Sequence, residues 1–278
     1  MGNLAAVLVA ALLGLTLVGT DAGGGAESFL RPLLGPAGSG RVVTERAPDG
    51  RAADFARIAV SLDRVDVRRL PLAVLLPRPV PRSPKGRIGS LEVRATNARL
   101  DSLRASEVAC AARDVHYDLP TALDGRSLRV TALGEHRLSV LLRNGDLDAW
   151  FAEQYPELIE PRLTFEQGRL VAKAKVPLVF VAFGVTISGV PALAQQRQVV
   201  LREIDLQTGR LELAPELRRR LLARLEVLLD LDQAFALPVP VVWTGLTTGD
   251  GWCRLTARLD AVETPRPAPA FQPRERYQ

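Results

Sequence analysis

Apolar and polar residues alternate with a period of two through much of this 278-residue chain. The regular stretches are residues 58–62, 91–95, 115–119, 138–142 and 170–180. This period places successive side chains on opposite faces of a β-strand, so it predicts sheets with one apolar face. Turn pairs such as Gln167-Gly168 and Asp250-Gly251 leave only short connections between stretches. Short connections favour hairpins and meanders over crossover helices, so we expect an α+β fold built mainly on antiparallel strands.

Two segments have helical spacing instead. The first begins at Asn144, a residue type favoured at N-caps, and ends near Tyr155, before Pro156. Its apolar residues on one face are Leu147, Trp150, Phe151 and Tyr155. Asp146 and Asp148 stand in its first turn, where a catalytic carboxylate pair is conceivable. We favour the simpler interpretation that they complement the helix dipole.

The second helix is predicted from Pro215 to about Leu229, with an apolar stripe of leucines and with arginines at other positions. Either it is a core helix with a solvated basic face, or it lines a lipid-holding groove with its arginines near headgroups. Residues 176–190 are apolar on both strand faces, and they are too short and too rich in β-branched residues for a membrane helix. They form either a strand or hairpin buried on both sides, or a strand pair whose second face meets a lipid chain.

The two ends of the chain differ in composition from its middle. Residues 4–19 are an uncharged apolar run, so residues 1–22 are predicted to be a signal peptide. Because no Lys or Arg precedes the run, an uncleaved signal anchor is the alternative. Residues 23–50 are predicted to be a Gly/Pro-rich linker, residues 51–262 the folded domain and residues 263–278 a disordered tail. We therefore expect an exported protein of the periplasm or cell envelope.

Few residues are suited to metal binding or catalysis. The chain has two His and two Cys, with no CxxC pair, which argues against zinc and iron–sulfur centres. It contains no phosphate-binding loop, zinc-protease or nucleophile-elbow motif, so we predict no enzyme activity, no cofactor and no metal. In an oxidising compartment Cys110 and Cys253 are candidates for a disulfide, and the alternative is two buried free thiols.

Basic residues concentrate in one part of the chain. The net charge is +5, but residues 41–104 alone contain 14 basic and 7 acidic residues. Within them a Pro-rich loop carries Arg78, Arg82, Lys85 and Arg87, which are predicted to contact lipid headgroups or a membrane surface. The alternative is a solubilising surface loop. Nucleic acid is not expected as a partner, because only 5% of residues are aromatic and because an exported protein leaves the compartment that contains nucleic acid.

The order of these pieces resembles a known family. The segments that carry the resemblance are RIGSLEVRATNARLDSLRASEVACAARDVHYDLPTAL (87–123), LSVLLRNGDLDAWFAEQYPEL (138–158), LTFEQGRLVAKAKV (163–176), ELRRRLLARLEVLLDL (216–231) and LPVPVVWTGLTTGDGWCRLTARL (237–259). Together they resemble the LmeA-like family of bacterial exported phospholipid-binding proteins. Asp146-Leu147-Asp148 stands where Asp-Leu-Asn is usual in that family.

The resemblance implies a tubular-lipid-binding-like fold, a half-tube in which a strongly curved antiparallel sheet wraps around amphipathic helices. It implies a phospholipid binder or carrier of the cell envelope that holds acyl chains in an apolar groove. The residues expected to line the groove are Leu147, Trp150, Phe151, Val179, Phe180, Phe183, Ile187, Leu221 and Leu225. The alternatives are an envelope hydrolase acting on lipid or glycan phosphoesters, and a structural interaction domain without a cavity.

Overall fold

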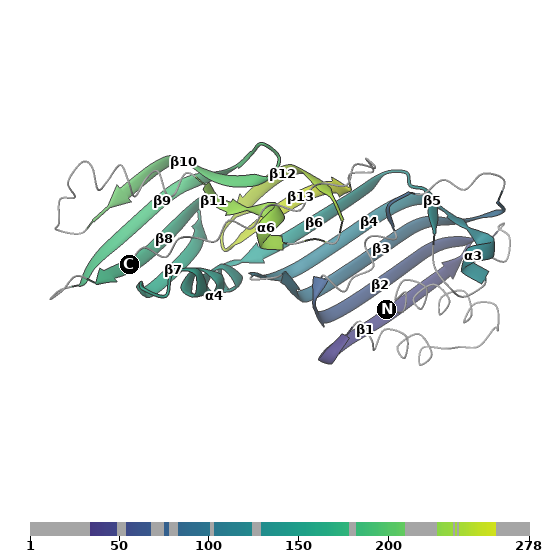
Figure 1. Ribbon diagram of the computed structural model, residues 1–278, viewed down its shortest axis with the longest axis horizontal. Coiled ribbons are helices and arrows are strands. Elements are labelled where there is room, and N and C mark those ends of the chain that lie inside the picture. The colour runs from purple at the N-terminus through teal and green to yellow at the C-terminus, as the bar shows by residue number, and fades with distance from the viewer. Residues whose placement is uncertain are drawn as a thin grey trace.

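A computed structural model describes ten stretches of the chain. They are residues 34–48, 54–67, 75–77, 83–100, 103–123, 129–177, 182–208, 227–235, 237 and 239–259. Within them the chain forms two β-sheets, which lie one after the other along the long axis of the molecule (Figure 1). The described helices are α3 (Leu119–Leu123), α4 (Asn144–Gln154) and α6 (Leu231–Phe235). None of the described helices is long and apolar enough to cross a membrane.

The larger sheet, sheet A, has eight strands in the order β1-β2-β3-β4-β6-β13-β12, with β5 paired to β4. Its strands are β1 (Leu34–Arg46), β2 (Phe55–Val65), β3 (Lys85–Leu100), β4 (Leu103–Asp118), β5 (Val130–Ala132), β6 (His136–Arg143), β12 (Val241–Gly249) and β13 (Trp252–Leu259). Neighbouring strands are antiparallel except β2 and β3, which are parallel. Antiparallel pairing is thus confirmed for most of the sheet. The expectation of hairpin connections is wrong for the parallel pair β2 and β3, and also for β6 and β13, which are far apart in the sequence.

Alternation along the strands gives sheet A one buried face. On β6, for example, Leu138, Val140 and Leu142 are buried, while Arg137 before them and Arg143 after them are exposed. Helix α6 packs on this face at the β12 edge, where the Phe235 ring meets the fully buried Trp243 ring edge-on at 5.2 Å between centroids. The period-two pattern therefore predicted the correct buried side chains.

The smaller sheet, sheet B, has five antiparallel strands in the order β11-β10-β9-β8-β7 and curls into a half-barrel. Its strands are β7 (Ile159–Glu166), β8 (Arg169–Pro177), β9 (Ala182–Ala194), β10 (Gln198–Gln207) and β11 (Val227–Asp230). The turn between β7 and β8 is the predicted Gln167-Gly168 pair, and both residues have positive φ, as a two-residue hairpin turn of type I′ requires. Strand β7 is one edge of this sheet and stands beside helix α4 (Figure 1).

Two boundary predictions are corrected. The stretch predicted as a linker contains strand β1, which pairs with β2 from Arg46 back to Leu34. Gly and Pro are tolerated there because β1 is an edge strand, whose outer backbone groups need no ladder partner. The helix predicted to end near Leu229 is a strand from Val227 onward.

The other boundary predictions fall outside the described residues. They are the signal segment 1–22, most of the helix that begins at Pro215, and the tail 263–278. The described residues therefore do not test whether sheet B wraps around a helix.

Gly86 provides a test of the packing at the start of β3. The buried Tyr117 side chain of β4 lies directly over it, and a Cβ at this position would overlap the ring. We expect Gly86→Ala to lower the free energy of unfolding by about 1–3 kcal/mol, because the ring must leave its place in the core. Urea unfolding measures this loss, and an unchanged midpoint would contradict the packing.

Candidate functional site

The inner face of sheet B is apolar over several strands. On β8 the side chains of this face are Leu170, Ala172, Ala174 and Val176. On β9 their register partners are Gly189, Ile187, Val185 and Phe183. The opposite face carries polar partners instead, such as Lys173 opposite Thr186. Of the two alternatives for residues 176–190, burial on both faces is therefore wrong for the described part, since Gly184 is exposed and Thr186 half-buried.

The apolar face is buried at one end and half-buried at the other. At one end Leu170 and its partner Gly189 are buried, and Val185 farther along β9 is buried too. Ala174, Val176, Phe183 and Ile187 are half-buried. The face thus runs from the interior of the molecule toward its surface along β8 and β9.

A small dry cavity lies at the buried end, where the two sheets meet. Its volume is about 30 Å³. The side chains around it come from both sheets and from α4, and none of them carries an oxygen or nitrogen except the Trp150 indole. They are Leu142, Leu147, Trp150, Leu163, Phe165, Leu170, Pro191, Val199, Leu228, Leu229, Cys253 and Leu255. This volume is about the share of one water molecule in the liquid, so the cavity alone is far too small for an acyl chain.

Helix α4 closes the junction between the sheets. Leu147, Trp150 and Phe151 form its buried face, as the helical spacing predicted. Leu147 and Trp150 reach the cavity, while the Phe151 ring packs on Tyr155 at 5.1 Å between centroids. Leu147 and Trp150 thus line this cavity, and their contact with a lipid chain stays a prediction.

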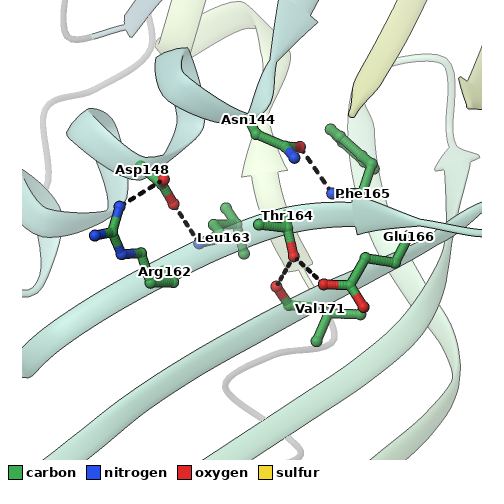
Figure 2. A network of polar contacts seen from close by, with 8 residues as sticks. All are labelled: Asn144, Asp148, Arg162, Leu163, Thr164, Phe165, Glu166 and Val171. Carbon is green, nitrogen blue, oxygen red and sulfur yellow. Dashed lines mark hydrogen bonds and ion pairs between the residues drawn. The ribbon is translucent and has the colours of Figure 1, made fainter. Parts of the chain in front are cut away.

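The polar residues of α4 bind the backbone of both sheets. Asp148 accepts a hydrogen bond from the Leu163 N–H at 2.6 Å, and Asn144 accepts one from the Phe165 N–H at 2.9 Å (Figure 2). Both donors belong to β7, an edge strand of sheet B. These N–H groups have no strand partner on that side, because β7 is the last strand of the sheet. The prediction that Asn144 caps the helix is therefore corrected: it is the first helical residue, and its side chain serves β7.

Asp146 makes the corresponding contact to sheet A. Its carboxylate accepts hydrogen bonds from the Ser106 N–H at 3.1 Å and the Ser106 hydroxyl at 2.7 Å. It also accepts one from the Arg143 N–H at 2.9 Å. Ser106 lies on β4, one residue beyond the last registered pair with β6, Glu107 with Leu141. At this point the segment after β6 continues into α4. Both aspartates thus satisfy backbone donors, which supports a structural role over a catalytic carboxylate pair.

Two turns complete the junction. The Gln167 N–H donates to the Asp250 carboxylate at 2.7 Å, and the Gly251 N–H donates to the Phe165 carbonyl at 2.9 Å. The Thr248 hydroxyl donates to the Gly168 carbonyl at 3.2 Å. The β7–β8 turn is therefore fixed to the β12–β13 turn.

The remaining predicted site residues have mixed outcomes. Phe183 and Ile187 lie on the apolar face of sheet B but do not line the cavity. Lys85 is exposed at the start of β3, and the exposed Arg87 forms an ion pair with Asp114. Six further residues lie outside the described part of the chain: Arg78, Arg82, Val179, Phe180, Leu221 and Leu225.

Cys110 and Cys253 are free and buried, so the disulfide alternative is not realised. Both stand in sheet A, but β6 lies between them, with Cys110 opposite Leu138 and Cys253 opposite Leu142. Two strand spacings separate their Cα atoms by more than about 9 Å, beyond the reach of a disulfide. Burial raises the pKa of each thiol to about 12.

Other titratable groups are engaged in structural contacts. The His136 ring nitrogens lie 3.0 Å from the Gly134 carbonyl and 3.3 Å from the Leu259 carbonyl. The buried Asp118 accepts hydrogen bonds from the Ser83 and Thr121 hydroxyls, which hold the pKa of its carboxyl below the usual value. In the described stretches no three His, Cys, Asp or Glu side chains gather in a way that could hold a metal ion.

Most of the cavity lining was missed from the sequence. Leu142 and Leu170 belong to alternating runs that predicted burial, whereas Leu163 and Phe165 lie in none of them. Nothing in those runs indicated that Leu142 of one sheet and Leu170 of the other would line the same cavity, because alternation defines a buried face but not what covers it.

Removal of the Asp148 carboxylate tests the junction. In Asp148→Ala the half-buried Leu163 N–H loses its acceptor, and we expect the free energy of unfolding to fall by about 1–3 kcal/mol. The control is Arg162→Gln, which removes only the ion pair between Arg162 and Asp148, whose arginine side chain is 70% exposed. That change should cost less than about 1 kcal/mol, and equal losses in urea unfolding would contradict the assignment.

The buried thiols give a pH-dependent prediction. At about pH 8 both remain protonated in the folded protein, so thiol reagents should modify Cys110 and Cys253 only after denaturation. In the unfolded chain they ionise near pH 9, while the folded thiols keep their protons to about pH 12. The two thiols therefore contribute less to the free energy of unfolding as the pH rises from about 9 to about 12. Rapid labelling of the native protein would contradict the burial.

Comparison with known proteins identifies the family. A sequence model of the LmeA-like phospholipid-binding family matches residues 79–258, more than half of the chain. No curated protein and no solved structure gives a significant match. The matched range holds β3 through nearly all of β13, and with them α4 and every residue that lines the cavity. This chain therefore belongs to the LmeA-like phospholipid-binding family.

Proposed function

We propose that this protein binds phospholipid with an acyl chain lying along the apolar face of sheet B. The observation that carries the proposal is the continuity of that face. It begins at the dry cavity beside Leu170 and continues through Ala172, Ala174 and Val176 without a polar side chain among them. The family to which the chain belongs supports the same class of ligand.

The length of the face suits an acyl chain. Six residue steps separate Leu170 from Val176, which corresponds to about 20 Å along the strand. One leaflet of a bilayer has a hydrocarbon thickness of about 15 Å. An extended acyl chain can therefore lie on β8 and β9 with its end at the cavity.

Half-buried side chains make this face a favourable place for hydrocarbon. Each methylene group transferred from water contributes about 0.8 kcal/mol. The half-buried Phe183 and Ile187 stand beside Val176 and Ala172, where such groups would lie. The cavity itself would take only the chain terminus, because its volume equals that of about one water molecule.

We further propose that the protein acts in the cell envelope. The uncharged apolar run at residues 4–19 supports export by a signal peptide or signal anchor. A protein that shields acyl chains from water there would act as a phospholipid carrier. The commitment of Asp146 and Asp148 to backbone N–H groups favours this role over hydrolysis of lipid phosphoesters.

A pair of adjacent substitutions tests the acyl-chain site. Ile187→Asn places an amide on the apolar face, and Thr186→Asn places the same group on the opposite face of the same strand. With a fluorescent phospholipid, we expect Ile187→Asn to weaken binding about tenfold, the equivalent of about two methylene contacts, and Thr186→Asn to leave it unchanged.

Native mass spectrometry of the purified protein provides the direct measurement. Phospholipid should co-purify with the unaltered protein and with Thr186→Asn, and less of it with Ile187→Asn. A protein that neither retains nor takes up phospholipid would exclude the proposal, as would equal effects of the two substitutions.

A further inference from the structure

The outer face of β6 and β13 carries four arginines. Arg137 and Arg143 of β6, and Arg254 and Arg258 of β13, all point away from the buried face and are exposed. The register places them at the two ends of the strand pair. Arg143 is opposite Trp252, and Arg137 and Arg258 each lie one position beyond the last registered pair, Leu138 with Ala257. We call these four residues the arginine face.

Within the described residues, no carboxylate forms an ion pair with the arginine face. Strands β6, β12 and β13 contain no Asp or Glu at all. Like charges close together on one sheet face oppose folding, so the arrangement is not explained by stability.

The other half of sheet A shows the contrast. Arg57 of β2 is within 3.8 Å of the Glu45 carboxylate and within 3.0 Å of the Glu92 carboxylate. Arg94 of β3 is 3.6 Å from Glu107 on β4. Glu107, which lies opposite Leu141 of β6, is thus already paired. Arg57 and Arg94 therefore have carboxylate partners that the arginine face lacks among the described residues.

Apolar groups are interleaved with the four arginines. The Arg254 guanidinium lies over the Trp252 ring, 5.8 Å from its centroid. Leu141 opposite Arg254 and Val242 opposite Arg258 are half-buried on this same face. A half-buried Trp among cations suits the headgroup region of a bilayer, where one side of the indole meets hydrocarbon and the other meets water.

We propose that the arginine face docks on an anionic phospholipid membrane. Each cation close to such a surface raises the binding constant about fivefold, so four of them give a substantial preference over a neutral membrane. The opposite face of the same two strands lines the cavity, through Leu142, Cys253 and Leu255. This docking surface does not depend on lipid in the interior, and it differs from the basic loop that the sequence suggested.

Vesicle co-sedimentation of the full chain tests the proposal. The unaltered protein should bind vesicles that contain phosphatidylglycerol, bind phosphatidylcholine vesicles far less, and lose binding as salt is added. Arg143→Gln with Arg254→Gln should weaken binding to the anionic vesicles about 25-fold. Arg137→Gln with Arg258→Gln, at the other end of the face, should weaken it similarly. Arg143→Lys with Arg254→Lys, which keeps both charges, should restore binding to within about threefold.

A double variant of equal charge is the control. Arg57→Gln with Arg64→Gln removes two arginines of β2 from the same sheet, but both of these are held in ion pairs. It should leave vesicle binding within about twofold, because charges farther away than a Debye length are screened. Unaltered thermal unfolding confirms that each variant is folded.

The proposal is overturned if the unaltered protein ignores anionic vesicles or if both glutamine pairs at the arginine face bind normally. It is also overturned if the control loses as much binding as they do. Binding to single-stranded DNA in place of vesicles would assign the surface to nucleic acid and overturn it too. Phospholipid uptake by the same variants reports separately on the interior, so failure of one proposal is distinguishable from failure of the other.

Discussion

The structure depends on backbone N–H groups that would otherwise lack partners at the ends of two sheets. Edge strand β7 presents the N–H groups of Leu163 and Phe165, and α4 meets them with Asp148 and Asn144. Strand β4 presents the N–H of Ser106 beyond its pairing with β6, and Asp146 meets it. A half-buried N–H without an acceptor costs more than an ordinary hydrogen bond gains, so these side chains determine where the helix lies. One short helix thereby holds the two sheets in contact.

This joint explains why an apolar cavity exists between the sheets. With the polar side of α4 committed to backbone groups, Leu147 and Trp150 are left to face the apolar residues of both sheets. Side chains from two separately curved sheets do not fill such a corner completely, and a dry space remains. The half-barrel of sheet B then carries the apolar surface outward from that corner. The two carboxylates of α4, Asp146 and Asp148, are already hydrogen-bonded to backbone N–H groups at this joint.

Local patterns in the sequence predicted the strands and their buried faces, but not how they assemble. Leu138, Val140 and Leu142 were expected to share a buried face, and they do. The division into two sheets could not be foreseen, because alternation is the same whichever partner covers the face. Strand β1 was missed since its glycines and proline resemble a linker, although an edge strand accepts them. The role of Asn144 was missed because the sequence does not show whether its side chain caps its own helix or accepts a hydrogen bond from a distant strand.

The distribution of surface charge could not be predicted from the sequence either. The most basic stretch of the sequence, residues 41–104, contains Arg57, Arg87 and Arg94, and in the fold each of them meets a carboxylate. The arginines of β6 and β13 are spread over more than a hundred residues of sequence, where no local count marks them as a group. The sheet places them on one face, and no ion pair within the described residues neutralises them. Strand pairing therefore determines which charged side chains are neighbours on the surface, and the number of charges in a stretch of sequence does not predict it.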